Sequence, residues 1–289
     1  MKQLLITALL LCVAAGAKAQ DFSDVEIGVT PLRGGIFMLS GAGGNVGVSA
    51  GDDGLLIIDD DYAPVIDKIR AALDGIAPDT PVNYVINTHF HGDHTGGNGH
   101  FHADDGAAIV AHENVRVRLL SDEAISPDAL PTITYENGVR VYFNNDTLTV
   151  DHLPGHTDGD SVVYFTKANV LHTGDLLFNG RFPYVDFASG GSVRQMIASL
   201  DHLATLIDDN TQVIPGHGPL ADRASLLRAA AMMRETLGIV QARISEGASL
   251  DAIIAAGVPE KFAQWSWRFI DNDKWLRTLY TELTDANPK

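Results

Sequence analysis

Short apolar runs alternate with longer amphipathic segments along the chain. Runs such as Leu55 to Ile58 are continuously apolar, which is typical of a strand buried on both faces. Other segments place apolar residues three or four positions apart, as helices that cover a core do; one runs from Pro64 to Gly75, and another follows Ser192, a favoured helix-capping residue. The pattern predicts an α/β fold with a less regular middle. Further strands are predicted at residues 35–40, 45–49, 82–87, 139–143, 148–153, 161–166, 170–172 and 212–214.

The N-terminal residues 1–19 have the pattern of an export signal. The apolar run Leu4 to Ala15 is followed by Ala17-Lys18-Ala19, the A-x-A form that signal peptidases cleave. This run is shorter than the roughly 20 residues of a membrane span. It contains the one cysteine, Cys12, so the rest of the chain has no thiolate ligand. We expect a signal peptide at residues 1–19, a periplasmic or secreted location, and a single domain over residues 20–289, since no linker interrupts them.

The charge of the chain narrows the class of partner. The sequence has 20 Lys+Arg against 37 Asp+Glu, and removal of Lys2 and Lys18 with the signal leaves 18 against 37, a formal net charge of −19. Such an acidic surface repels nucleic-acid phosphates and anionic lipids. We therefore expect a small-molecule substrate, no nucleic-acid partner and no membrane partner after signal removal, and the oligomeric state stays open.

Potential metal ligands follow the ends of several predicted strands. The stretch THFHGDHTGGN, residues 88–98, is predicted to form neither a regular helix nor a strand, and it follows the strand at 82–87. Loops at strand ends can gather side chains that are distant in sequence. Five imidazoles and two carboxylates occupy such positions, enough for two adjacent metal ions: His89, His91, Asp93, His94, His156, Asp175 and His217.

The donor types favour zinc. Imidazole and carboxylate without thiolate suit Zn²⁺ at a catalytic site, and iron or manganese fits the same donors. Two such ions about 3.5 to 4 Å apart can share a water and lower its pKa from roughly 15.7 to about 7. The sequence therefore predicts a hydrolytic centre with two Zn²⁺ ions and a hydroxide nucleophile.

The ligand motifs resemble those of the metallo-β-lactamase fold superfamily. The matching motifs are HFHGDH at 89–94, PGHTDGD around His156, HTGDLLF around Asp175 and IPGHGP around His217. The resemblance implies an αββα sandwich, two mixed β-sheets flanked by helices. It assigns His89, His91 and His156 to the first metal and Asp93, His94 and His217 to the second, with Asp175 bridging both. It also makes Asp59 a candidate support for the ligand loop, although Asp59 also fits a solvated turn.

The loop at residues 178–192 is expected to line the substrate pocket. Arg181 can pair with a substrate carboxylate, and Phe182 and Tyr184 can pack on an apolar ring. Tyr184 can also donate its hydroxyl to a developing oxyanion. The alternative is that these aromatic residues only pin the loop to the sheet. A second wall is expected from the glycine-rich residues 39–48, whereas the three tryptophans, Trp265, Trp267 and Trp275, are expected to dock the C-terminal helix.

The predicted activity is metal-assisted hydrolysis of an acyl bond in a cyclic amide, lactone or related ester, with Asp93 orienting the nucleophile. β-Lactam hydrolysis is expected to be weak, because Leu176 to Phe178 replace the polar groups that hold the drug's carboxylate in β-lactamases of the family. Two alternatives stay open. One is a mononuclear iron dioxygenase acting on persulfides, and the other is a thioesterase of the glyoxalase II type.

Overall fold

Two β-sheets face each other in the computed structural model, which describes residues 21–284. The first sheet has the strand order β1 to β7, in which the first four strands pair antiparallel and the pairs from β4 to β7 are parallel. Its strands are β1 (Gly28–Pro31), β2 (Ile36–Ser40), β3 (Val46–Gly51), β4 (Gly54–Ile58), β5 (Val82–Ile86), β6 (Ala108–His112) and β7 (Ile133–Tyr135).

The second sheet has the order β12-β11-β10-β9-β8 and is antiparallel except for the parallel pair β11 and β12. Its parallel pair follows from the long connection through α5 that separates the two strands in sequence. Its strands are β8 (Gly138–Phe143), β9 (Asp146–His152), β10 (Ser161–Phe165), β11 (Val170–His172) and β12 (Gln212–Ile214).

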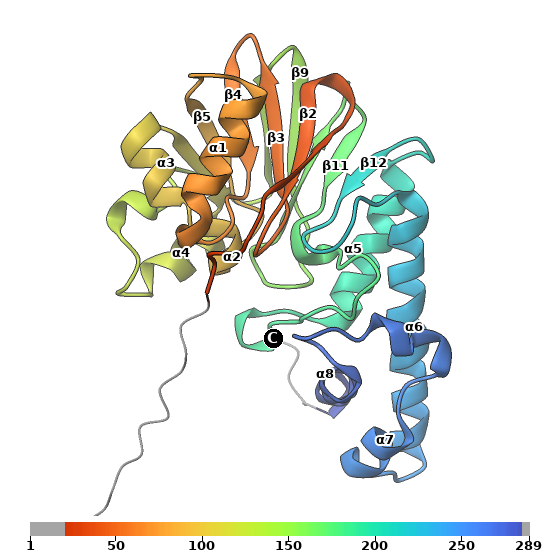
Figure 1. The fold of residues 1–289 in the computed structure, drawn as a ribbon. Coiled ribbons are helices and arrows are strands. Elements are labelled where there is room, and N and C mark those ends of the chain that lie inside the picture. The colour runs from red at the N-terminus through yellow and green to blue at the C-terminus, as the bar shows by residue number, and fades with distance from the viewer. Residues whose placement is uncertain (1–20, 285–289) are drawn as a thin grey trace, which may run out of the picture.

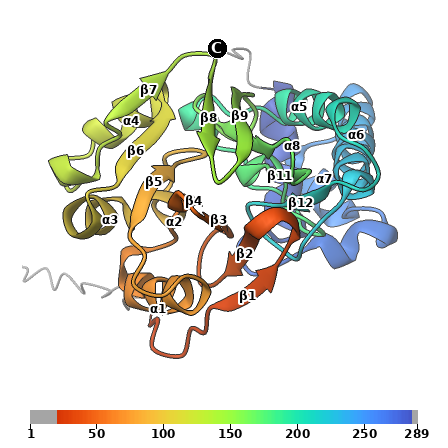
Figure 2. The ribbon, with the colours of Figure 1, turned by 90° about the horizontal axis from the view of Figure 1, so that it is seen from above.

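Helices cover the outer face of each sheet, so the layers run helix, sheet, sheet, helix (Figures 1 and 2). Figure 1 shows α1 against the first sheet and α5 and α6 beside the second, with α7 and α8 below. This arrangement confirms the predicted αββα sandwich. The helices are α1 (Ile66–Ile76), α2 (Gly92–Thr95), α3 (Asn98–Asp105), α4 (Glu113–Leu120), α5 (Val193–Leu206), α6 (Arg223–Ser245), α7 (Leu250–Ala256) and α8 (Asn272–Thr284).

Strand β4 shows why its sequence is continuously apolar. Leu56 and Ile58 point into the core between the two sheets, whereas Leu55 and Ile57 point into the core beneath α1. All four are at most 1% exposed. Successive side chains of a strand alternate between its faces, and each face here is covered, so every position must be apolar.

The predicted elements mostly agree with the structure, with differences at their ends and in the middle. Ser192 caps α5 by accepting a hydrogen bond from the backbone N–H of Gln195, as its sequence position predicts. The helix predicted to stop at Gly75 continues to Ile76. The expectation of no regular structure in residues 88–98 is wrong, because α2 and the start of α3 lie there. The middle is also more regular than expected, since it contains β6, α4 and β7.

Within residues 21–284, no helix is both long enough and apolar enough to cross a bilayer. The expected signal peptide at residues 1–19 lies outside the described part of the chain.

Candidate metal centre

The seven candidate ligands converge from four loops, each of which follows a strand. The loop after β5 carries His89 and the helix α2, and the loop from β9 to β10 carries His156. Asp175 lies in a 3-10 turn after β11, and His217 follows β12. The sheets hold these loops rigidly side by side, as strand-end sites require.

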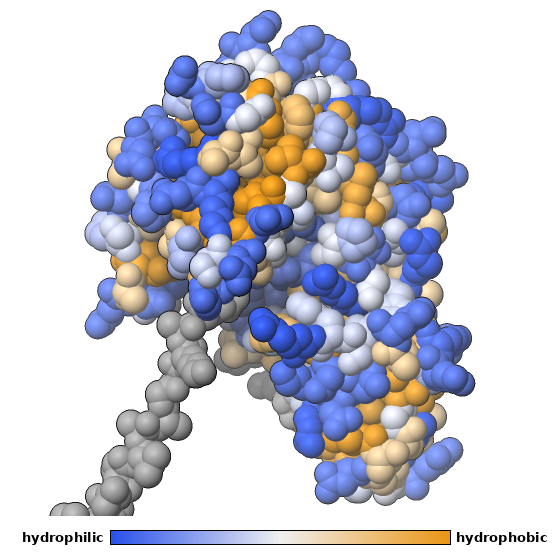
Figure 3. Space-filling view, viewed as in Figure 1, coloured by the Kyte–Doolittle hydropathy of each residue, from blue (hydrophilic) through white to orange (hydrophobic). Residues whose placement is uncertain are grey.

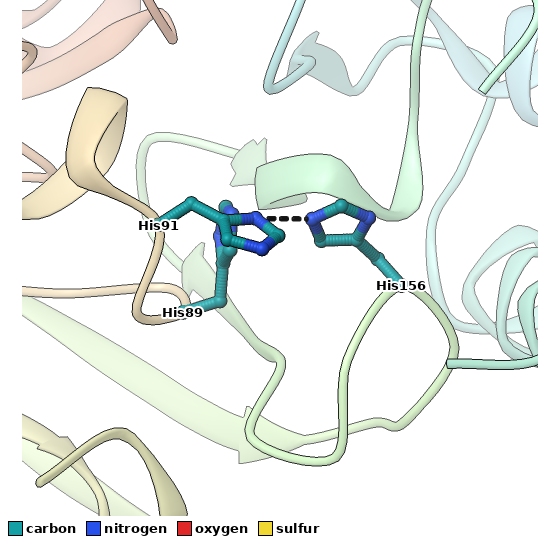
Figure 4. Close-up of side chains that lie close together, drawn as sticks. All are labelled: His89, His91 and His156. Atoms are coloured by element: carbon teal, nitrogen blue, oxygen red, sulfur yellow. Dashed lines mark hydrogen bonds between the residues drawn. The ribbon is translucent and has the colours of Figure 1, made fainter. Parts of the chain in front are cut away.

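The first group consists of three imidazoles, His89, His91 and His156. One nitrogen from each lies within 4.8 Å of the others. Figure 4 shows the rings converging, with Nδ1 of His91 and Nε2 of His156 only 2.9 Å apart. Three converging imidazoles are a sufficient ligand set for catalytic zinc.

The second group consists of Asp93, His94 and His217, whose ligand atoms also lie within 4.8 Å of one another. Oδ2 of Asp93 is 3.4 Å from Nε2 of His217 and 3.7 Å from Nε2 of His94. The structure therefore brings together the two triads that the resemblance implies.

Asp175 lies between the two groups. Its Oδ2 is 3.5 Å from Nε2 of His156 in the first group and 3.4 Å from Nε2 of His217 in the second. Its Oδ1 is 3.2 Å from Nε2 of His94. A carboxylate in this position can reach ions in both groups.

Buried atoms without partners provide a test of whether metal fits. His89 Nε2, His94 Nε2 and Asp175 Oδ1 are buried and form no hydrogen bond within the described residues. Unpaired buried polar atoms cost free energy, so native proteins rarely keep them without a function. His89 and His94 each belong to one of the two groups, and Asp175 lies between the groups. The residues present therefore fit a pair of metal ions.

Asp59 orients two of the imidazoles, His94 directly and His89 through Thr88. Its buried carboxylate accepts hydrogen bonds from the Thr88 backbone N–H and hydroxyl, both at 2.7 Å, and from Nδ1 of His94 at 2.8 Å. Because the Thr88 hydroxyl donates to Asp59, its oxygen accepts from Nδ1 of His89, 3.0 Å away. Nε2 of both histidines is thereby left free for metal. Of the two interpretations of Asp59, the structure favours support of the ligand loop.

The other imidazoles of the first group are oriented in the same way. Nδ1 of His156 donates to the backbone carbonyl of Tyr184 at 2.9 Å, which leaves Nε2 for metal. Nε2 of His91 donates to Oδ2 of Asp186 at 3.1 Å, which leaves Nδ1. Asp186 is a functional residue that the sequence reasoning missed, because only the tertiary fold brings its loop to His91.

The two groups differ in charge. Burial holds the pKa of His89 well below its ordinary value and lowers that of His156 to about 4. Burial acts the same way on His94 and His217, but the carboxylates of Asp175 and Asp93 together, with Asp59 for His94, outweigh it. They raise the pKa of His94 well above its usual range and that of His217 to about 9. The carboxylates around His94 and His217 therefore favour a positive charge at the second group, as a cation site requires.

Two glycines permit the close packing around the ligands. A Cβ on Gly44 would lie 2.2 Å from the His94 ring, and a Cβ on Gly216 would lie 2.0 Å from Oδ1 of Asp175. Both distances are impossible for real atoms. The glycine-rich turn between β2 and β3 and the PGH turn after β12 can therefore approach the centre only with glycine at these positions.

A cavity of about 760 Å³ opens onto the two groups. Figure 3 shows a recess in the surface between the sandwich and the C-terminal helices. Residues of the 39–48 segment form one wall of the cavity, as expected. Arg181 and Tyr184 line it, and so do Trp267, Arg268 and Phe269 from the segment before α8.

Two expectations about the pocket are wrong. Phe182 does not reach it, because its side chain is fully buried and stacks on Trp275 at a centroid distance of 5.5 Å. Trp267 does line it, although the tryptophans were expected only to dock the C-terminal helix. Trp275 behaves as expected: it is fully buried in the core that packs α8 against α6.

The contact between Asp186 and His91 gives a testable expectation. Burial would raise the pKa of Asp186, but hydrogen bonds from His91 and Ser189 lower it to about 2, so the group is an anion at neutral pH. Asp186→Asn keeps an oxygen for Ser189 but removes the charge that orients His91. We expect the affinity of the first group for zinc to fall by about 10- to 100-fold, measured by competition with a chromophoric chelator.

The matched control is Asp208→Asn, which removes a carboxylate from an exposed turn. It should bind zinc as the parent protein does. Equal zinc affinity in Asp186→Asn and the parent would show that Asp186 does not position His91.

Comparison with known proteins agrees with this site. The sequence model of the Metallo-beta-lactamase superfamily matches residues 41–217, more than half of the chain and all seven candidate ligands. Acyl-coenzyme A thioesterase MBLAC2 from Gallus gallus is 28% identical over 244 residues, 72% of this chain and 87% of the relative. Hydroxyacylglutathione hydrolase from Nitrosococcus oceani is 32% identical over 139 residues, 47% of this chain and 48% of that enzyme, so only about half of its length is matched.

Among solved structures, a metallo-beta-lactamase from Pontibacter korlensis has the same fold. It superposes with a TM-score of 0.63 at 17% identity, over 72% of this chain and 99% of that one. The chain therefore belongs to the metallo-beta-lactamase superfamily and is a hydrolase.

Proposed function

We propose that this chain holds two zinc ions and hydrolyses an acyl bond of a small-molecule substrate. The observation that carries the proposal is the position of Asp175, whose carboxylate lies within 3.5 Å of imidazole nitrogens from both triads. The nitrogen and oxygen donor set suits zinc, and iron or manganese fits the same donors. When bound, a zinc pair supplies a water that is deprotonated near neutral pH and polarises the substrate carbonyl.

Asp93 is the residue best placed to orient the attacking water. It lies at the cavity surface, and its Oδ2 faces His94 and His217. Burial would raise its pKa, but the charge of His94 and the hydrogen bond from His217 lower it, so the carboxylate is ionised and can accept a proton.

Tyr184 is the candidate donor to the oxyanion. Its ring lies in the cavity wall, with centroids 5.8 Å from His91 and 5.7 Å from His156. Burial raises the pKa of its hydroxyl, which therefore keeps its proton at neutral pH and can donate it in a hydrogen bond.

The relatives support an acyl substrate. The names of two of them, an acyl-coenzyme A thioesterase and a hydroxyacylglutathione hydrolase, both specify an acyl group. Efficient β-lactam cleavage is not favoured, because Leu176 and Leu177 are at most 1% exposed and Phe178 stacks on His217. None of the three offers a polar group to a drug's carboxylate at the positions that β-lactamases of the family use for it, and the nearby Arg181 lies elsewhere in the lining, over Trp267.

The direct test is turnover by protein reconstituted with zinc. A panel of thioesters, esters, lactones and β-lactams should show hydrolysis of acyl compounds, with β-lactams the poorest. Failure to hydrolyse any of them with two zinc ions bound would overturn the proposal. Oxygen uptake with a persulfide by iron-loaded protein would instead support the dioxygenase alternative.

We also propose that the chain is exported and acts as one domain over residues 20–289. The A-x-A pattern at residues 17–19 motivates this. N-terminal sequencing of protein recovered from the periplasm should begin at Gln20, and an intact Met1 would contradict it.

A further inference from the structure

The charges around the cavity are unusual for so acidic a protein. Apart from the proposed metal ligands, the only charged side chains among the described residues that line it are Arg181 and Arg268. The chain as a whole has 37 acidic residues against 20 Lys+Arg. A pocket whose free charges are all positive attracts an anionic ligand, and bound metal ions would strengthen the attraction.

Both arginines are unpaired within residues 21–284. Neither forms an ion pair, whereas Arg70, Arg118 and Arg194 all do so. Arg181 instead lies over the Trp267 ring, 5.0 Å from its centroid, and Arg268 is exposed on the next residue of the chain. Guanidinium groups held at a cavity without a carboxylate partner can bind a ligand's carboxylate in a bidentate manner.

An aromatic wall adjoins the arginines. The Trp267 ring lies 6.1 Å from Phe178 and 5.7 Å from Phe269, and Phe269 lies 5.4 Å from Tyr184. The wall thus extends from the second metal group to Tyr184.

Hydrogen bonds fix this wall in place. The indole N–H of Trp267 donates to the backbone carbonyl of Phe182 at 2.9 Å, and the Phe182 backbone N–H donates to the carbonyl of Trp265 at 2.8 Å. The buried side chain of Phe182 stacks on Trp275, and this contact anchors the segments around Phe182 and Trp267 to the core. A fixed aromatic surface binds an apolar or flat group with little loss of conformational entropy.

The wall lies only partly outside the stretch that the family model matches: Phe178 and Tyr184 fall within residues 41–217, whereas Trp267 and Phe269 do not. The match ends at His217, and Trp267, Arg268 and Phe269 come about fifty residues later.

We propose that the pocket selects acyl compounds that carry a second, anionic group next to an apolar or aromatic body. Arg181 and Arg268 bind the anionic group, and Trp267 with Phe269 packs on the body. This proposal rests on the proposed function, since it names the substrate class for the same centre.

The binding test separates charge from shape and needs no turnover. Terephthalate and terephthalamate share a ring and one carboxylate, and they differ only in whether the far group is a carboxylate or a neutral amide. Both compounds are titrated into the zinc-loaded protein and followed by calorimetry. Terephthalate should bind about tenfold more tightly, because only it can offer one carboxylate to the metal centre and a second to the arginines at the same time. The Arg181→Gln/Arg268→Gln double variant should bind both equally. Arg140→Gln, at an exposed position of β8 remote from the cavity lining, is the control and should keep the preference.

The turnover test uses thioesters matched in the same way. One pair has a 4-carboxybenzoyl or a 4-carbamoylbenzoyl acyl group on one neutral thiol, and another has the carboxylate or its amide on the thiol instead. The parent should prefer the anionic member of at least one pair by about tenfold in kcat/KM, and the pair that shows it identifies which side of the acyl bond faces the arginines.

The outcomes distinguish the two proposals. Terephthalate preference without hydrolysis of any thioester, ester, lactone or β-lactam would leave the anion pocket supported and overturn the proposed function. Hydrolysis without any charge preference, or a preference unchanged in the double variant, would overturn the anion pocket and leave the proposed function standing.

Discussion

Replacement of Asp175 by alanine should reduce the bound zinc from about two ions per chain toward one. Asp175 is the group that reaches both triads, and its carboxylate offsets the repulsion between two adjacent dications. Burial would raise its pKa, but His217 and His94 hold it well below its ordinary value, so the group is anionic in the parent. The first group keeps three imidazoles, a set that suffices for zinc, whereas the second loses its charged neighbour.

Hydrolysis should fall by at least about a hundredfold in the same variant, because the nucleophile loses its second activating ion. Elemental analysis after dialysis and steady-state kinetics measure the two effects. Asp151→Ala, at an exposed position of β9, is the matched control and should keep both ions and full activity. If Asp175→Ala retains two tightly bound ions, Asp175 does not bridge them.

Replacement of Asp59 should have the largest effect on stability. Its fully buried carboxylate accepts three hydrogen bonds, from the Thr88 N–H, the Thr88 hydroxyl and His94 Nδ1. Asp59→Ala leaves all three donors without a partner. We expect a loss of about 3 to 5 kcal/mol in the free energy of unfolding. Urea unfolding of the metal-free protein at one pH measures it.

The backbone of Asp59 adds to the cost for alanine, because its φ of 60° is tolerated better by aspartate and asparagine. Asp59→Asn avoids that strain and should lose less stability, but it should still weaken zinc binding by about 10- to 100-fold, since His94 loses its anionic partner.

The neighbouring Asp60 provides the control for Asp59. It is also fully buried, but burial raises the pKa of its carboxyl well above the usual range, which favours the neutral form. This carboxyl accepts one hydrogen bond, from the Gly97 N–H. Asp60→Asn should therefore change stability and zinc binding little. If Asp60→Asn lowers stability and zinc affinity as much as Asp59→Asn does, burial of these consecutive aspartates, and not the hydrogen bond to His94, explains the effect.

Most of the ligand set could be predicted from the sequence, because each ligand follows a recognisable strand and sits in a motif. The apolar run Leu55 to Ile58 also predicts a strand buried on both faces, and the structure confirms this. These predictions succeed because strand burial and strand ends are local properties of the chain.

The missed features depend on contacts between distant loops. Asp186 meets His91 across 95 positions, and Trp267 meets Phe182 across 85. No local periodicity signals such contacts. The strands β6 and β7 were missed for a different reason. β7 has only three residues, and β6 is a short apolar run between two helices, which periodicity alone does not distinguish from a buried part of a helix.

Phe182 was misplaced because alternation along a loop does not show which side chain faces the core. Its neighbours Arg181 and Tyr184 line the cavity, whereas Phe182 stacks on Trp275 from α8. The packing of α8 against this loop depends on the tertiary fold, and no local sequence pattern indicates which residues of the two segments meet.

Anomalous X-ray diffraction from crystals of zinc-loaded protein, recorded on either side of the zinc absorption edge, locates the bound ions directly. We expect two zinc peaks about 3.5 to 4 Å apart, one beside His89, His91 and His156 and the other beside Asp93, His94 and His217, with Asp175 between them. A single peak, or zinc bound away from these residues, would contradict this expectation.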